Sequence, residues 1–173
     1  MTFEPLLTAS PAIHIHVAAA IAAFALGGWV LFRPKGGPRH RLAGRLWVAL
    51  MLVVALSSFF IHAIRMWGPW SPIHLISLGT LVSLAYGVQM ARIRKIAAHQ
   101  RTMQATYLGG LVIAGGFTFL PGRIMFEVMF GGPSVWPGVA LGLAIVATGV
   151  GLTAWRLWPQ AAGRITGARL AHR

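Results

Sequence analysis

The chain lacks most of the side chains on which enzymes rely. It has no cysteine, and Glu4 and Glu127 are the only acidic residues among 173. Disulfides, iron–sulfur ligation and thiol chemistry are therefore excluded. Catalysis by paired carboxylates is not expected either, and sites for hard cations such as Ca²⁺ lack their usual ligands. Any chemistry must come from other residue types.

What the chain has in abundance is apolar sequence, with 57% hydrophobic residues. Five apolar runs each approach the ~20 residues that a helix needs to cross ~30 Å of hydrocarbon. The sequence predicts an all-α, polytopic transmembrane helical bundle with five transmembrane helices, namely a four-helix core plus a fifth. The gaps are too short for a soluble domain, so residues 1–173 are expected to form a single integral membrane domain. The runs are 13–32, 42–64, 73–90, 103–120 and 138–157.

Basic residues are distributed unevenly among the gaps between these runs. Of the fifteen Lys and Arg residues, only Arg65 and Arg123 lie in the second and fourth gaps. The others lie in the first and third gaps, in the tail, or one turn inside the second run. The positive-inside rule then places the N-terminus outside and the C-terminus in the cytoplasm, in the inner membrane of a bacterium. The net charge of +13 is explained by this topology and by anionic lipid at the cytoplasmic face, and nucleic acid is not expected as a partner.

Local signals predict several helix boundaries and packing surfaces. Ser10 followed by Pro11 is typical of a helix start. The segment 121–137 is expected to hold a short helix lying in the outer interface. On the second helix, small residues at a spacing of three and four define a seam that faces the bundle and ends at a histidine. The seam comprises Gly44, Val48, Met51, Ala55, Ser58 and His62.

The seven histidines are the main remaining chemical resource, and the expected topology sorts six of them into two layers. His14, His16, His62 and His74 lie toward the outer side, whereas His40 and His99 lie at the cytoplasmic rim. His14 and His16 point to nearly opposite faces, and the deeper His16 is favoured to face the interior. A simpler interpretation is that interfacial histidines bond headgroups and backbone carbonyls.

Two kinds of ligand site are compatible with this layout. Paired histidines on facing helices hold b-type haem in helical bundles, and Gly-rich helices leave room for a porphyrin. A cluster of His16, His62 and His74 that binds Cu or Zn is equally compatible with the position of these residues in the outer layer. Arg41, Arg45 and Arg101 are expected to crowd the inner histidines, where they would neutralise haem propionates or anionic lipid headgroups.

Several segments resemble the DUF2306 family of small predicted membrane proteins. They are HIHVAAAIAAFALGGWVLFRPKGGPRHRLAGRLWV at 14–48, SPIHLISLGTLVSLAYGV at 71–88 and HQRTMQATYLGGLVIAGGFTFLPGRIM at 99–125. The resemblance covers a core at 11–125, which leaves a fifth helix at 137–158 and a basic cytoplasmic tail at 159–173. The family implies no established biochemical role. The histidine layout is similar to that of cytochrome b561-like bundles, and this analogy implies that His16 pairs with His74 outside and His40 with His99 inside.

Two functions therefore remain open from the sequence. The first is a haem-binding protein of membrane electron transfer, either an electron carrier or a component of a membrane oxidoreductase. The second is a cofactor-free accessory subunit of a larger respiratory or photosynthetic complex. Gly138 and Gly142 form a GxxxG pair, and their face suits close approach either to the bundle or to such a partner.

Overall fold

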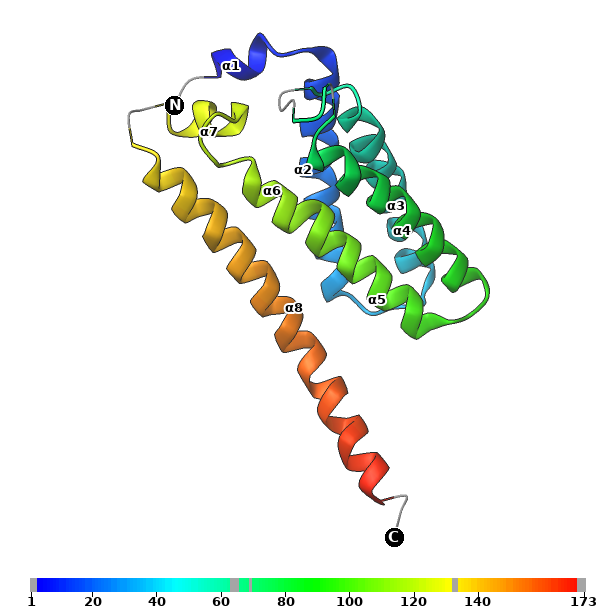
Figure 1. Cartoon of the computed structure of the whole chain (residues 1–173). Coiled ribbons are helices and arrows are strands. Elements are labelled where there is room, and N and C mark those ends of the chain that lie inside the picture. The colour runs from blue at the N-terminus through cyan, green and yellow to red at the C-terminus, as the bar shows by residue number, and fades with distance from the viewer. Residues whose placement is uncertain (1–2, 63–65, 69, 132–133, 171–173) are drawn as a thin grey trace.

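The computed structural model describes residues 3–62, 66–68, 70–131 and 134–170, and regular structure in these ranges is helical (Figure 1). Within the last helix, side chains are described as far as Ala154, except that of Thr153. The long helices lie side by side as a bundle. The short helices lie at one end of it.

Four helical segments form the bundle. They are α2 (Pro11–Phe32), α3 (Pro38–Ser58), α4 (Pro72–Arg92) and a continuous path through α5 (Ile96–Tyr107), the π-helix η1 (Leu108–Ile113) and α6 (Ala114–Phe117). Consecutive segments pack against each other, and the fourth packs back on α2, which closes the bundle. Accordingly α2 and α4 lie diagonally. The short helices α1 (Glu4–Leu7) and α7 (Ile124–Met129) pack against each other, and α8 (Trp136–Leu170) follows them.

Proline sets the first residue of each long bundle helix. Pro11, Pro38 and Pro72 begin α2, α3 and α4. The first helical N–H has no partner within the helix, so a residue without N–H costs nothing there, and its fixed φ suits the helix. The helix start predicted at Ser10–Pro11 is confirmed, although the Ser10 side chain makes no capping hydrogen bond.

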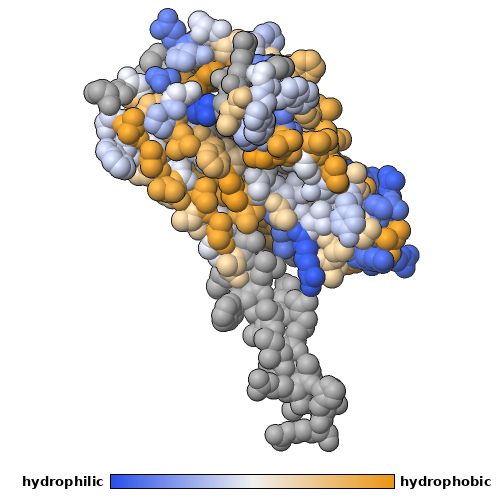
Figure 2. Space-filling view, in the orientation of Figure 1, coloured by the Kyte–Doolittle hydropathy of each residue, from blue (hydrophilic) through white to orange (hydrophobic). Residues whose placement is uncertain are grey.

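The protein is an integral membrane protein by the length and composition of its helices. Among the described residues α2, α3 and α4 are long and apolar enough to cross a bilayer, and α8 carries a shorter apolar stretch, Trp136–Leu152. Large apolar side chains such as Ile21, Leu78 and Val82 are more than half exposed, and apolar surface covers much of the bundle in Figure 2. A lipid environment accounts for such a surface, because proteins surrounded by water rarely expose apolar patches of this extent. Five spans and the orientation of the termini stay predictions.

The core lies where α2, α3, α4 and η1 meet. Its fully or nearly fully buried side chains come from all four segments: Ala23, Trp47, Met51, Leu84 and Leu111. The indole Nε1 of Trp47 donates a hydrogen bond to the Ala23 carbonyl over 3.1 Å. This bond satisfies a polar group that would otherwise be costly to bury.

The glycine face of α8 packs within the chain. A Cβ placed on Gly142 would lie 2.7 Å from the Gly116 carbonyl of α6, and one on Gly138 would collide with Phe119 and Phe126. Of the two uses expected for the Gly138 and Gly142 face, the structure shows close packing against the bundle, and it does not support a partner in a larger complex at this face. Beyond the bundle, α8 continues as a lone helix toward the C-terminus (Figure 1).

Candidate functional site

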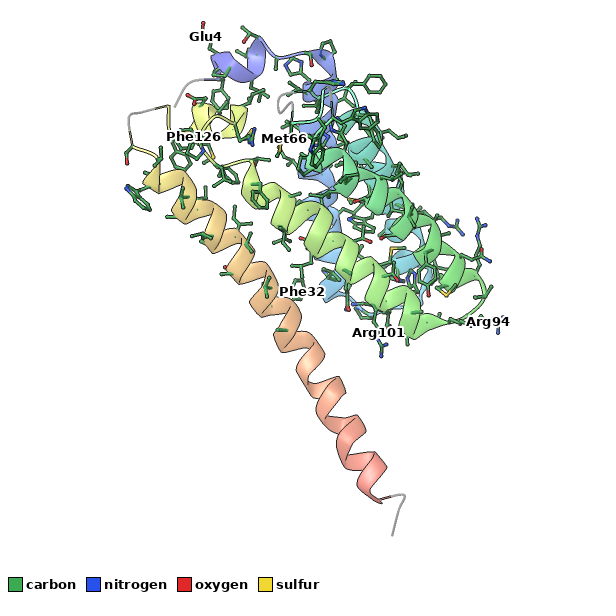
Figure 3. All side chains as sticks on the ribbon, viewed as in Figure 1. Glu4, Phe32, Met66, Arg94, Arg101 and Phe126 are labelled. Carbon is green, nitrogen blue, oxygen red and sulfur yellow. The ribbon has the colours of Figure 1, made fainter. Side chains whose placement is uncertain are left out.

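Basic residues gather at one end of the bundle, around the turns at 33–37 and 93–95, and this end is called the basic end. The opposite end holds α1, α7 and residues 59–62, 66–68 and 70–71. Figure 3 shows Arg94 and Arg101 at the basic end and Glu4, Met66 and Phe126 at the opposite end. Among the described residues, a cavity lies toward each end of the bundle.

The larger cavity lies between α2, α5 and α8 at the basic end and is called the α8 cavity. Its volume is about 890 Å³, which is near the top of the ~300–1,000 Å³ typical of small-molecule sites. Both His40, from the start of α3, and His99, from α5, line it. The structure thus brings together the pair expected at the inner rim.

The ring of His99 is oriented by the backbone of α4. Its Nδ1 lies 2.8 Å from the Gly87 carbonyl oxygen. A carbonyl only accepts, so Nδ1 carries the proton, and the neutral ring keeps a lone pair on Nε2. Gly87 permits the close approach of the two helices, since a Cβ there would collide with the methyl group of Met103. A backbone acceptor on one ring nitrogen is the usual support of a metal-binding histidine.

The basic side chains near this pair differ from those expected. Arg33 and Lys35 line the α8 cavity, whereas Arg41, Arg45 and Arg101 are exposed and do not line it. Arg33 lies over the Trp29 ring at 5.3 Å. Lys35 Nζ donates to the Leu31 and Arg33 carbonyls, which satisfies carbonyl groups at the end of α2.

At the opposite end, His74 is 98% buried, since only 2% of its surface is exposed. Its Nδ1 accepts a hydrogen bond of 3.1 Å from the backbone N–H of Ser71 and lies 3.1 Å from the Ser71 hydroxyl. The bond from the Ser71 N–H is one half of a capping box, in which histidine takes the place usually held by glutamate. In the other half the Ser71 side chain accepts from the backbone N–H of His74. The rings of Phe59, His62 and Trp70 surround it at centroid distances of 5.9, 5.6 and 5.3 Å.

The capping box fixes the hydrogen-bonding role of His74. Because Nδ1 accepts, the proton of the neutral ring lies on Nε2. This Nε2 is buried and has no hydrogen-bond partner among the described residues. A metal or haem iron bound at Nε2 would need a lone pair there, and so the ring as placed is a donor and not a ligand.

His16 has the opposite arrangement. Its Nδ1 lies 3.0 Å from the Val54 carbonyl and 3.0 Å from the Ser57 hydroxyl on α3. Since the carbonyl accepts, Nδ1 donates and Nε2 keeps the lone pair. The structure does not assemble the set His16, His62 and His74, because in the described residues no three His or acidic side chains are grouped to hold a metal. Only the His62 and His74 rings adjoin.

His16 lines the smaller cavity, which lies between α2, α3, α4 and the η1–α6 segment and is called the four-helix cavity. Its volume is about 380 Å³. Ser58, Ser77 and Thr80 add hydroxyl groups to an otherwise apolar lining. His74, one turn from Ser77, does not line it. His16 and His74, which are predicted to pair across the bundle, therefore do not line a common cavity.

The two cavities share a wall. Phe24 and Ile145 line both of them, and the Phe24 ring stacks on Tyr107 at 5.8 Å. Tyr107 also donates to the Phe24 carbonyl over 3.2 Å. Sequence reasoning missed Tyr107, although His99, Met103 and Tyr107 recur every fourth residue, which places them on one face of a helix.

A family model described as "Predicted membrane protein (DUF2306)" matches residues 13–148. The match extends past the core at 11–125 and into α8, which agrees with the packing of α8 on the bundle. No curated protein and no solved structure matches the chain. Because the family model covers most of the sequence, the chain belongs to the DUF2306 family of predicted membrane proteins.

Proposed function

We propose that this membrane protein binds b-type haem in the α8 cavity, with His99 and His40 as iron ligands, and takes part in membrane electron transfer. The observation that carries the proposal is that two histidines from different helices line one cavity of about 890 Å³. Bis-histidine sites in helical bundles are built in this way.

The state of the His99 ring supports its role as the stronger ligand. The Gly87 carbonyl holds the proton on Nδ1, so Nε2 is left as the basic nitrogen without any further rearrangement. His40 lies in the first turn of α3 after a turn that contains four further lining residues, Arg33, Pro34, Lys35 and Gly36.

The charge at the rim suits a ligand with carboxylate groups. Arg33 and Lys35 are both lining residues, and no acidic side chain is among the described residues that line the cavity. Cationic side chains stabilise carboxylates through charge-assisted hydrogen bonds. The apolar lining from α8, including Ala144, Ile145 and Leu152, would exclude water from the edge of the porphyrin ring. A bound haem would supply one-electron chemistry.

Titration of haemin into the detergent-purified full chain tests the proposal. We expect saturable, stoichiometric binding with a Soret band and reducible α-bands. His99→Ala and His40→Ala should each weaken binding by more than the ~10–100-fold that loss of a supporting hydrogen bond costs at a metal site.

His62→Ala serves as the matched control, because His62 is exposed at the opposite end of the bundle. It should bind haemin like the unchanged chain. Equal binding by the unchanged chain, His99→Ala and His40→Ala would contradict the proposal and favour a cofactor-free accessory subunit.

A further inference from the structure

The four-helix cavity is chemically different from the α8 cavity. Its described lining contains no Lys, Arg, Asp or Glu and is mostly apolar. Its volume of about 380 Å³ lies near the lower limit of the ~300–1,000 Å³ found for ligand sites. It therefore suits a smaller and neutral molecule, because a charged group would lose its hydration without gaining a countercharge.

His16, Ser58 and Ser77, which line this cavity, can accept hydrogen bonds from a ligand. His16 donates from Nδ1 to the Val54 carbonyl, so its remaining nitrogen, Nε2, has a lone pair. Ser77 directs its hydroxyl proton to the Ile73 carbonyl over 3.0 Å, and Ser58 directs its proton to the Ala55 carbonyl over 2.7 Å or to Ser77. A ligand that pairs with these groups must bring its own donor.

The position of the cavity within the bundle adds a steric requirement. Gly110 of η1 forms part of its wall, and a Cβ there would lie 3.3 Å from both Met51 Cε and Thr80 Oγ1. Ala20 and Ala114 also line it. Small residues from two segments therefore leave room for the ring of a small molecule.

From these observations we infer that the four-helix cavity binds a small neutral molecule of the phenol class, whose hydroxyl group donates to His16 Nε2. The aromatic ring lies against the apolar lining, and the hydroxyl group faces the acceptors. The four-helix cavity and its ligand differ from those of the haem site, and binding there does not require haem in the α8 cavity.

A matched pair of probes tests the hydrogen bond directly. Binding of para-tert-butylphenol and of its methyl ether, which lacks the donor, is measured by equilibrium dialysis against the detergent-purified full chain, with empty micelles as the blank. One net hydrogen bond is expected to favour the phenol by about fivefold. Equal affinity for the two probes would overturn the inference.

Two variants and one control locate the site. His16→Ala should remove the preference for the phenol, whereas His14→Ala should keep it, because His14 is exposed and bonds the Leu6 carbonyl. Ala20→Phe fills the cavity while His16 remains, and it should weaken binding of both probes. If His16→Ala does not fold, Ala20→Phe decides alone. If Ala20→Phe bound both probes as well as the unchanged chain does, or if His16→Ala kept the preference for the phenol, the ligand would not bind in this cavity as proposed.

Discussion

At the scale of single residues, identical side chains take opposite roles because of their backbone neighbours. His74 and His99 are both turned by main-chain groups. An N–H group donates to Nδ1 of His74, whereas a carbonyl accepts from Nδ1 of His99. The first ring therefore presents a donor at Nε2, and the second presents a lone pair. Ligand chemistry follows the neighbour and not the residue type.

This difference predicts the tautomer of His74. ¹⁵N NMR of the labelled protein in detergent at neutral pH should show His74 protonated on Nε2, because the Ser71 N–H occupies Nδ1. His99 should show the proton on Nδ1. Assignments are made by His74→Gln and His99→Gln, each of which removes one set of signals. Protonation of His74 on Nδ1 would contradict the capping box.

At the scale of elements, glycine decides how closely the helices approach. A Cβ on Gly27 of α2 would collide with the Trp47 and Tyr107 rings, and one on Gly149 of α8 would collide with Val112. Along the π-helix, Gly110 and Leu111 line the four-helix cavity and Val112 lines the α8 cavity. Short π segments are frequent at functional sites.

Gly27→Ala should therefore destabilise the bundle. The added methyl group overlaps the buried Trp47 ring and the partly buried Tyr107 ring, and overpacking of this kind costs about 1–3 kcal/mol. Thermal unfolding in detergent, followed by circular dichroism, should show a lower midpoint. Gly79→Ala is the matched control, because nothing lies within 4 Å of its Cβ position. A midpoint no lower than that of Gly79→Ala would contradict the close contact.

At the scale of the whole molecule, charge separates the two ends of the bundle. The turns that join α2 to α3 and α4 to α5 hold Arg33, Lys35, Arg94 and Lys95. The opposite end carries Trp67 and Trp70, which are more than half exposed. Lys and Arg favour the cytoplasmic side, and tryptophan favours the interface. The bundle is thus expected to lie with its basic end in the cytoplasm.

Accessibility of single cysteines tests this orientation, since the chain has no cysteine of its own. Met66→Cys, at a position that is 60% exposed, should react with an impermeant thiol reagent on intact cells. Ala97→Cys, at an exposed position on α5, should react only after the membrane is opened. The reverse pattern would contradict the positive-inside assignment. Ser71 is unsuitable for labelling because it is 1% exposed.

The sequence by itself determined the membrane class, the positions of the bundle helices and several of their first residues. These features depend on hydropathy and on the fixed φ of proline, which act over neighbouring residues. The pattern also located the inner face of α3 at Met51, Ala55 and Ser58, which are buried. Gly44 of the same seam has open space around it, and Trp47 is buried instead.

Only the tertiary structure decided which histidines share a cavity and what each ring presents to it. His40 and His99 were grouped by analogy of layout, and the same analogy grouped His16 with His74, which the structure places in different surroundings. The proton on each ring is set by a main-chain group, and for His16 and His99 that group lies on another helix, at Val54 and Gly87. No spacing along one helix encodes such a contact, because it depends on how the helices pack.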